Sequence, residues 1–227
     1  MKRSSFVPVL ALLITAGAAE ATTHVGIIST ERSSPRTSAR LNAAGNNGGA
    51  ATFTVFPAGA APISDTLDLS SDGKFVSSAS SSVPEIQNLF TGSGSLTALV
   101  RVDILEGGSA TLEQSSTDGK IVLALPPIDQ AASPRFQFPV GDLQQGTVLL
   151  IGNPNPSPNS VVVRVGQSAP EPARPIAAFG VLAVEMTVPN TLVVAVAQDP
   201  SLLLVAQLAV DTGRTTVMTY LPSSIVD

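Results

Sequence analysis

The side chains of this chain that could do chemistry are mainly carboxylates. They form two groups in the sequence, one of Asp65, Asp68 and Asp72 and another of Asp103, Glu106, Glu113 and Asp118. Two carboxylates that face each other across a cleft can hydrolyse a glycosidic bond, and several of them with loop carbonyl oxygens can bind calcium. No Asp-x-Asp-x-Asp-Gly loop occurs, and acids beside turn glycines also serve as turn formers and solvated strand edges. The candidate calcium ligands are Asp65, Asp68, Asp72 and Asp118, with turn and edge positions as the competing interpretation.

Other catalytic groups are scarce. The chain has one histidine, His24, and no cysteine. We expect His24 to lie near a frayed N-terminus, where no packing would hold it as a general base. A single histidine without cysteine also excludes the usual zinc sites and the Ser-His-Asp and Cys-His arrangements. The sequence therefore predicts no catalytic residue, no resident cofactor and a non-enzymatic protein.

Aromatic residues that could stack on a sugar ring are also few. There is no tryptophan and one tyrosine, Tyr220. Phe136 and Phe138 alternate around Gln137 and could form an exposed pair, but we expect them to anchor the first strand of the second half of the chain. Glycan binding through loops at one end of the protein stays an alternative.

The first residues have the three parts of a signal peptide. Met1-Lys2-Arg3 is basic, the segment from Phe6 to Ile14 is apolar apart from Pro8, and Ala19-Glu20-Ala21 is a small-x-small cleavage site. The apolar segment is shorter than the ~20 residues that a spanning helix needs. We therefore expect residues 1–21 to be removed, which leaves an exported protein without a membrane span, whether periplasmic, cell-surface or extracellular. The net charge of −5 and the lack of a basic cluster predict no nucleic-acid partner.

Composition and alternation predict β-strands. The chain is 44% hydrophobic but only 4% aromatic and 13% charged, and its abundant Val, Thr, Ser and Gly are typical of strands and turns. Apolar and polar residues alternate in segments 51–56, 95–103, 120–125, 161–165 and 214–221. The predicted fold class is all-β, with one short helix that begins at an N-cap on Ser82 and includes Pro84.

The two halves of the chain resemble each other in layout. Polar turns at 41–49 and 151–159 each lead into a predicted strand, and 95–103 aligns with 191–199. This similarity indicates either a divergent internal repeat or the likeness that any two Val-, Thr- and Gly-rich segments share. A boundary at residues 130 and 131 gives an N-terminal part, 22–130, and a C-terminal part, 131–227, each of which suits an antiparallel β-sandwich.

Three segments carry a resemblance to a known family. They are Asn153-Pro154-Asn155, the residues from Pro84 to Phe90, and Tyr220-Leu221-Pro222. Their layout resembles exported bacterial proteins built from immunoglobulin-like β-sandwich repeats in tandem. The resemblance implies two immunoglobulin-like sandwiches and a surface, adhesive or scaffolding role, and it implies no catalytic residue.

The stretch from Ile176 to Leu208 is unusually apolar, with Glu185 and Asp199 as its only charged residues. Strands that are apolar on both faces are buried on both sides, either within one fold or against a partner, and the absence of aromatic girdles argues against lipid. The candidate interaction surface consists of Phe179, Val181, Leu192, Val194, Leu203 and Val205. The sequence therefore predicts an exported structural, adhesive or assembly protein that binds a protein partner or itself. A glycan- or calcium-binding extracellular module is the alternative.

Overall fold

The computed structural model of the protein describes residues 21–29, 36–45, 49–69, 75–89, 97–105, 107–116, 119–140, 147–211 and 216–219. The predicted signal peptide, residues 1–21, lies outside the described residues except for Ala21. The first half of the fold contains β1 (Thr22–Ser29), β2 (Arg36–Gly45), β3 (Ala50–Pro57), β4 (Ile63–Asp68), β5 (Phe75–Ser77), the 3₁₀ turn Ser78–Ser80, α1 (Pro84–Gln87), β6 (Thr97–Ile104), β7 (Gly108–Ser116) and β8 (Gly119–Leu125). After α2 (Ile128–Ala131), the second half contains β9 (Arg135–Val140), β10 (Val148–Gly152), β11 (Asn159–Val165), β12 (Arg174–Ile176), β13 (Val181–Glu185), β14 (Thr191–Ala197), β15 (Val205–Asp211) and β16 (Thr216–Thr219).

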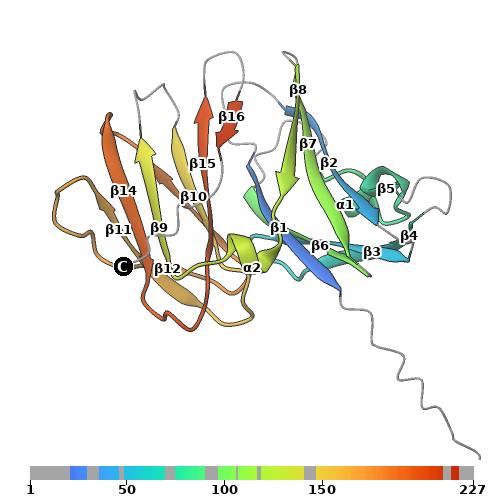
Figure 1. Cartoon of the computed structure of the whole chain (residues 1–227), viewed down its shortest axis with the longest axis horizontal. Coiled ribbons are helices and arrows are strands. Elements are labelled where there is room, and N and C mark those ends of the chain that lie inside the picture. Colours follow the sequence, from blue (N-terminus) through green and yellow to red (C-terminus); the bar gives the residue numbers. More distant parts are fainter. Residues whose placement is uncertain are drawn as a thin grey trace, which may run out of the picture.

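These strands form antiparallel sheets of four strands each (Figure 1). The first half contributes the sheets β1-β6-β3-β4 and β5-β2-β7-β8, and the second half contributes β12-β11-β14-β9 and β13-β10-β15-β16. Each sheet draws its strands from one half only. The predicted all-β fold class is confirmed.

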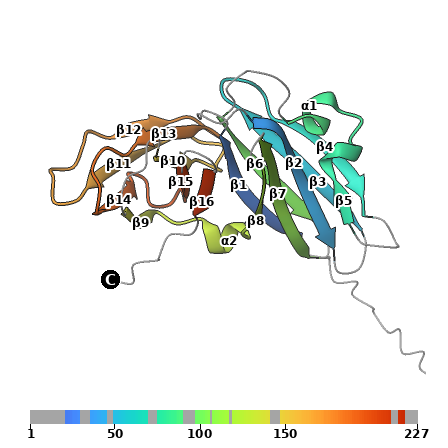
Figure 2. The ribbon, with the colours of Figure 1, turned by 90° about the horizontal axis from the view of Figure 1, so that it is seen from above.

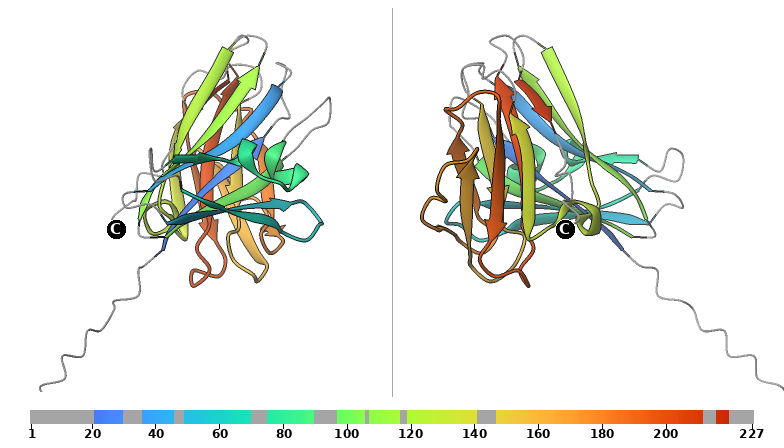
Figure 3. Two further views of the ribbon diagram at one scale, coloured as in Figure 1. Left: turned by 90° about the vertical axis from the view of Figure 1, so that its right-hand side faces the viewer. Right: turned by 60° about the vertical axis from the view of Figure 1, so that its left-hand side comes forward.

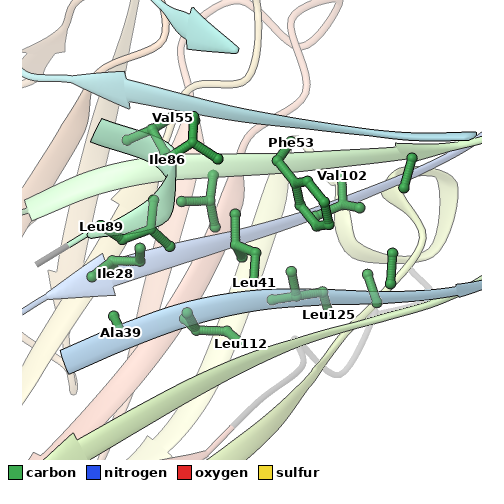
Figure 4. Close-up of a cluster of buried hydrophobic side chains, with 14 of the residues drawn as sticks. Ile28, Ala39, Leu41, Phe53, Val55, Ile86, Leu89, Val102, Leu112 and Leu125 are labelled. Carbon is green, nitrogen blue, oxygen red and sulfur yellow. The ribbon is translucent and has the colours of Figure 1, made fainter. Parts of the chain in front are cut away.

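Alternation along the strands places the apolar side chains of the first half between its two sheets. On β6, Ala98, Val100 and Val102 are fully buried in this core, whereas the side chain of Arg101 lies on the other face of the sheet. This is the alternation that the sequence predicts for residues 95–103, because strand side chains repeat with a period of two. Figure 4 shows the contributions of other strands to the same core, among them Ile28, Leu41, Phe53, Leu112 and Leu125.

The second half has a separate core between its own two sheets. Val161 and Val163 of β11 are buried there, while Arg164 is exposed. Phe136 and Phe138 of β9 are buried in the same core with their ring centroids 6.3 Å apart. The predicted role of this phenylalanine pair as a core anchor is confirmed.

The predicted helix is present but is only one turn long, and its N-cap is Val83. The prediction of Ser82 as the cap is therefore wrong. The hydroxyl of the preceding Ser81 accepts the N–H of Val83 at 3.0 Å and donates to the carboxylate of Asp65 on β4. Because Ile86 is fully buried, α1 covers part of the first core.

Residues 126–134 connect the two halves and include α2, which Figure 2 shows at the junction. The N–H of Val25 on β1 donates to the carbonyl of Pro126 at 3.2 Å. Ser133 and Leu204 exchange two backbone hydrogen bonds of 2.9 and 3.0 Å. The connection is therefore bonded to both halves, and the predicted boundary at residues 130 and 131 falls within it.

Candidate functional site: the seam between the halves and two open surfaces

The two halves contact each other through apolar side chains, and we call this contact the seam. Its buried members come from β1, β3 and β6 of the first half, from α2, and from β10 and β15 of the second half: Val25, Ile27, Phe56, Leu99, Ala131, Leu150 and Val205. Figures 2 and 3 show the corresponding sheets facing each other, with the strands of the second half crossing those of the first. Burial of one such Val, Leu or Phe side chain contributes about 1.5–3 kcal/mol, so the seam is a stabilising contact.

The backbone of β10 comes very close to the first half at Gly152. A β-carbon at this position would lie 2.8 Å from Cδ1 of Leu99 and 2.9 Å from Cγ2 of Val205. Glycine is required here because any side chain would displace those of the seam. The sequence indicates only a turn at this glycine and gives no sign of its place in a contact between halves.

A hydrogen-bonded asparagine loop supports the seam from the second half. Asn153 is fully buried, and its Nδ2 donates to the carbonyl oxygens of Ser157 at 2.8 Å and Ala177 at 3.0 Å. Its Oδ1 accepts the backbone N–H of Asn155 at 3.2 Å and the Nδ2 of Asn155 at 2.7 Å. The Nδ2 of Asn155 also donates to the carbonyl of Leu203 at 2.7 Å. The Asn-Pro-Asn segment is therefore a structural cluster built around the buried side chain of Asn153.

The asparagine loop positions Phe179 at the seam. The N–H of Phe179 donates to the carbonyl of Asn155 at 3.1 Å, and Asn153 donates its own N–H to Gly180 at 2.9 Å. Phe179 has a φ of +53°, which is unfavourable for a bulky residue. Its ring stacks on that of Phe56 from the first half, with centroids 4.5 Å apart and planes 17° from parallel. The loop and the stack together hold this strained backbone conformation.

The six residues of the predicted interaction surface lie in three places. Phe179, Val181 and Val205 pack into the seam against the first half of the same chain, where Val205 is buried and the other two are partly buried. Leu203 lies in the loop before β15 and is 39% exposed. Leu192 and Val194 lie on β14, on the face that points away from the second core. The structure therefore does not bring these six residues together as one surface.

The outer face of β14, which we call the β14 face, is apolar and open to solvent. Leu192 and Val196 are each 39% exposed, and Val194 lies between them. Across the sheet, Val196 pairs with Val162 of β11, and Val194 pairs with Arg164. On the other side of β14, Val196 pairs with Arg135 of β9. The β14 face therefore presents a strip of branched aliphatic side chains between two arginines. The sequence did not single out Val196, although its alternation with Val193 and Ala195 could have done so.

The second half also has a polar groove of about 810 Å³, separate from the β14 face. It runs between the turn that joins β11 to β12, the strand β13 and the loop after it, and it reaches Ser29 of the first half. Its charged residues are Glu171, Arg174 and Glu185, of which Glu171 and Arg174 form an ion pair at 2.5 Å. We call this feature the groove.

The two candidate calcium ligands that the structure describes, Asp65 and Asp68, do not point to a common site. On β4, Asp65 pairs with Phe53 and lies on the core-facing side of the strand, where Ser81 donates to it, whereas Asp68 is exposed and pairs with Ala50 on the opposite side. Residues three apart on a strand point to opposite faces. Asp72 and Asp118 lie outside the described residues. Within the part of the chain that the structure describes, no three His, Asp or Glu residues are grouped to hold a metal ion.

The second group of acids is partly occupied by structural contacts. Asp103 on β6 accepts hydrogen bonds from Nε of Arg101 at 2.8 Å and from the hydroxyl of Thr23 at 2.5 Å. Glu106 lies outside the described residues. Asp103 is therefore held by side chains of its own sheet, whereas Glu113 lies on β7 in the other sheet of the first half.

His24 is not at a frayed end, and that expectation is wrong. It lies within β1, its side chain is 3% exposed, and its Nδ1 is 2.8 Å from the carbonyl oxygen of Leu125. Its Nε2 is buried and has no hydrogen-bond partner among the described residues. The pairing of β1 with β6 over eight residues holds His24 in place. The sequence near the N-terminus gave no sign of this pairing.

Asp199 lies in the loop between β14 and β15, where its carboxylate accepts two hydrogen bonds from Ser201. Hydrogen bonds from the side chain and then the backbone N–H of Ser201 lower the pKa of Asp199 below its usual 3.8. A depressed carboxyl pKa gives a stabilising contribution that is present above the unfolded pKa and is lost as the pH falls through the folded pKa. We expect Ser201→Ala to raise the pKa of Asp199 toward 3.8, measured by carboxyl NMR titration. Ser168→Ala, which removes a hydroxyl from a different exposed turn, is the control and should leave this pKa unchanged.

Comparison with known proteins gives no match to a family model, to a curated protein or to a solved structure. Among the described helices, none combines the length and apolarity that a bilayer crossing requires. The function must therefore be argued from the seam, the β14 face and the groove.

Proposed function

We propose that this chain is an exported, non-enzymatic structural, adhesive or assembly protein made of two immunoglobulin-like β-sandwiches in tandem, and that it binds a protein partner through the β14 face. The tandem reading is supported by two separate cores, each enclosed by two sheets of one half. The export reading is supported by the N-terminal basic, apolar and small-residue segments.

The observation that carries the proposal is that some apolar side chains of the second half pack against the first half, whereas others are exposed to solvent. Val205 is buried at the seam and Val181 is partly buried there, so their apolar character is explained within the chain. Leu192 and Val196 have no such cover among the described residues and are each 39% exposed. Exposed apolar side chains that are contiguous on a sheet face are typical of protein contact surfaces.

The chemistry of the β14 face favours a different protein over a second copy in a two-fold dimer. Arg164 lies beside Val194 on this face, and a two-fold contact would bring the arginines of the two copies near each other. An apolar surface with an acidic rim would instead complement both the aliphatic strip and the arginine. The partner that fits is therefore a protein with exposed aliphatic side chains and nearby carboxylates.

The test compares the chain from residue 22 with the double substitution Leu192→Ser and Val196→Ser. We expect the wild-type chain to bind an apolar-surface dye and to be retained on an acidic protein surface more strongly than the double variant. Both side chains are already partly exposed, so the substitutions should cost less than about 1 kcal/mol of stability each. Light scattering after size-exclusion chromatography identifies self-association, and a monomer whose dye binding the substitutions do not change would contradict the proposal.

The calcium-binding alternative has a separate test. Thermal unfolding of the same chain with calcium and with a chelator is expected to give the same midpoint, because Asp65 and Asp68 lie on opposite faces of β4. A calcium-dependent rise in the midpoint would favour the alternative, since a ligand that binds only the folded state stabilises it.

A further inference from the structure

Among the described residues, the strand β13 has a partner strand along one edge only. It pairs with β10 on one side and ends its sheet on the other. Asn153 donates to the carbonyl of Gly180 at 2.9 Å, and Met186 donates to that of Thr147 at 3.0 Å. Antiparallel pairing alternates, so the even-numbered residues of this strand bond to β10, and the N–H and C=O groups of the odd-numbered residues point to the free edge. Those residues are Val181, Ala183 and Glu185.

Two other edges of the second half are protected, whereas that of β13 is not. In the facing sheet, β9 and β12 are the edge strands, and they contain Pro139 and Pro175. Proline cannot donate a backbone hydrogen bond and blocks the addition of another strand. The five residues of β13 contain no proline. This strand is therefore open to pairing in a way that β9 and β12 are not.

The groove lies along this open edge. Its lining includes Ala183, Val184 and Glu185 of β13 together with the turn of residues 165–168 from the facing sheet. Figure 2 shows β12 and β13 along the same side of the second half. A volume of about 810 Å³ admits a short extended peptide, and binding sites of several hundred cubic ångströms are of ligand size. The described residues that line the groove include no aromatic ring on which a sugar would stack.

The charge of the groove indicates which peptide it fits. Glu171 is neutralised by Arg174, and Glu185 has no partner among the described residues. In a strand added beside β13, the residue opposite Glu185 would point to the same face of the sheet, within reach of its carboxylate. A lysine or arginine at that position would form an ion pair.

We propose that the open edge of β13 and the groove bind an extended peptide segment of a partner protein, which adds a fifth strand to the sheet β13-β10-β15-β16 and places a basic side chain beside Glu185. Backbone hydrogen bonds to the odd-numbered residues would supply affinity, and the carboxylate would supply selectivity. This inference shares with the proposed function only the idea of a protein partner, because the edge and the β14 face are different surfaces.

The probe is a blocked peptide with the sequence Thr-Val-Lys-Val-Thr, with a second peptide that has Glu in place of Lys. We expect the lysine peptide at about 1 mM to shift the amide NMR signals of Val181, Ala183 and Glu185 and to slow their hydrogen exchange. The glutamate peptide should bind about fivefold more weakly, since like charges across a strand pair repel. Absence of any shift at these three amides would overturn the proposal.

Two variants separate edge pairing from a general loss of structure. Ala183→Pro removes an N–H that points away from β10, so the existing sheet is retained, and we expect affinity to fall about tenfold, the change for one lost hydrogen bond. Ala183→Ser keeps the N–H and should bind within about twofold of wild type. Glu185→Lys should reverse the preference between the two peptides. Equal binding by the proline and serine variants would contradict pairing at this edge.

Competing occupants give different results in the same experiment. Protection of the three amides that rises with protein concentration and needs no peptide would assign the edge to a second copy and overturn the peptide proposal. Peptide-induced shifts confined to Leu192 and Val196 would assign binding to the β14 face and also overturn it. The double serine variant of the β14 face should bind the lysine peptide as wild type does, so failure of one proposal can be told from failure of the other.

Discussion

Leu150→Asp is expected to separate the two halves of the protein while leaving both cores folded. Leu150 is 1% exposed and lies in the seam, whereas its neighbours Leu149 and Ile151 point into the second core. A carboxylate buried without a partner costs several kcal/mol. Opening the seam hydrates that carboxylate and breaks no strand pairing. It should therefore cost less free energy than unfolding either core.

Calorimetry and small-angle X-ray scattering measure this separation. We expect one cooperative transition for the wild type, because the seam couples the halves, and two transitions with a larger radius of gyration for Leu150→Asp. Leu150→Met is the matched control, since it keeps the volume and apolar character and should cost less than about 1.5 kcal/mol. If Leu150→Asp instead unfolds everything in a single transition, the two halves do not fold independently of each other.

The strands and their buried faces could be predicted because they follow from local alternation. On β6, the residues Ala98, Val100 and Val102 repeat every second position, and that repeat alone places them in a core. The same reasoning holds for Val161 and Val163 on β11. Which sheet faces which core depends on strand order, and no local pattern contains that information.

The contents of the seam could not be predicted for the same reason. The sequence marks Val205 and Val194 equally as apolar residues on strands with two apolar faces. One is buried against the first half and the other lies on an open sheet face. The difference arises from the docking of two sheets that are far apart in the sequence, which brings the backbone of Gly152 close to Leu99.

Single hydrogen bonds also escaped prediction where neighbouring residues are chemically alike. The sequence predicts the helix cap at Ser82, but the hydroxyl that donates to Asp65 on β4 belongs to the chemically identical Ser81. That contact is a tertiary one, and it decides which hydroxyl turns toward the N–H of Val83. The carboxylate that had been a candidate calcium ligand thereby has a structural partner.

Asn153→Ala is expected to lower the free energy of unfolding by about 2–4 kcal/mol. The change leaves the carbonyl oxygens of Ser157 and Ala177 without their amide donor, and it leaves two donors of Asn155 without their acceptor. In a chain of this size the melting temperature should fall by about 5–15 °C. Asn155→Ala is the control, because it removes a partly exposed amide and should cost about 1 kcal/mol.

Asn153→Asp distinguishes a hydrogen-bonded cluster from a position that merely needs the volume of asparagine. The introduced carboxylate would face the same two carbonyl oxygens that now accept the Nδ2 of Asn153, and this repulsion raises its pKa above the usual value of about 3.9. A carboxyl whose pKa is raised in the folded state is most destabilising at neutral pH, and the loss shrinks as the pH falls through that raised pKa. We therefore expect this variant to be less stable than Asn153→Ala at pH 7 and to recover part of the difference near pH 4, measured by denaturant unfolding at both pH values. A loss that did not depend on pH would mean that the side chain of Asn153 acts by filling space in the loop and not through its hydrogen bonds.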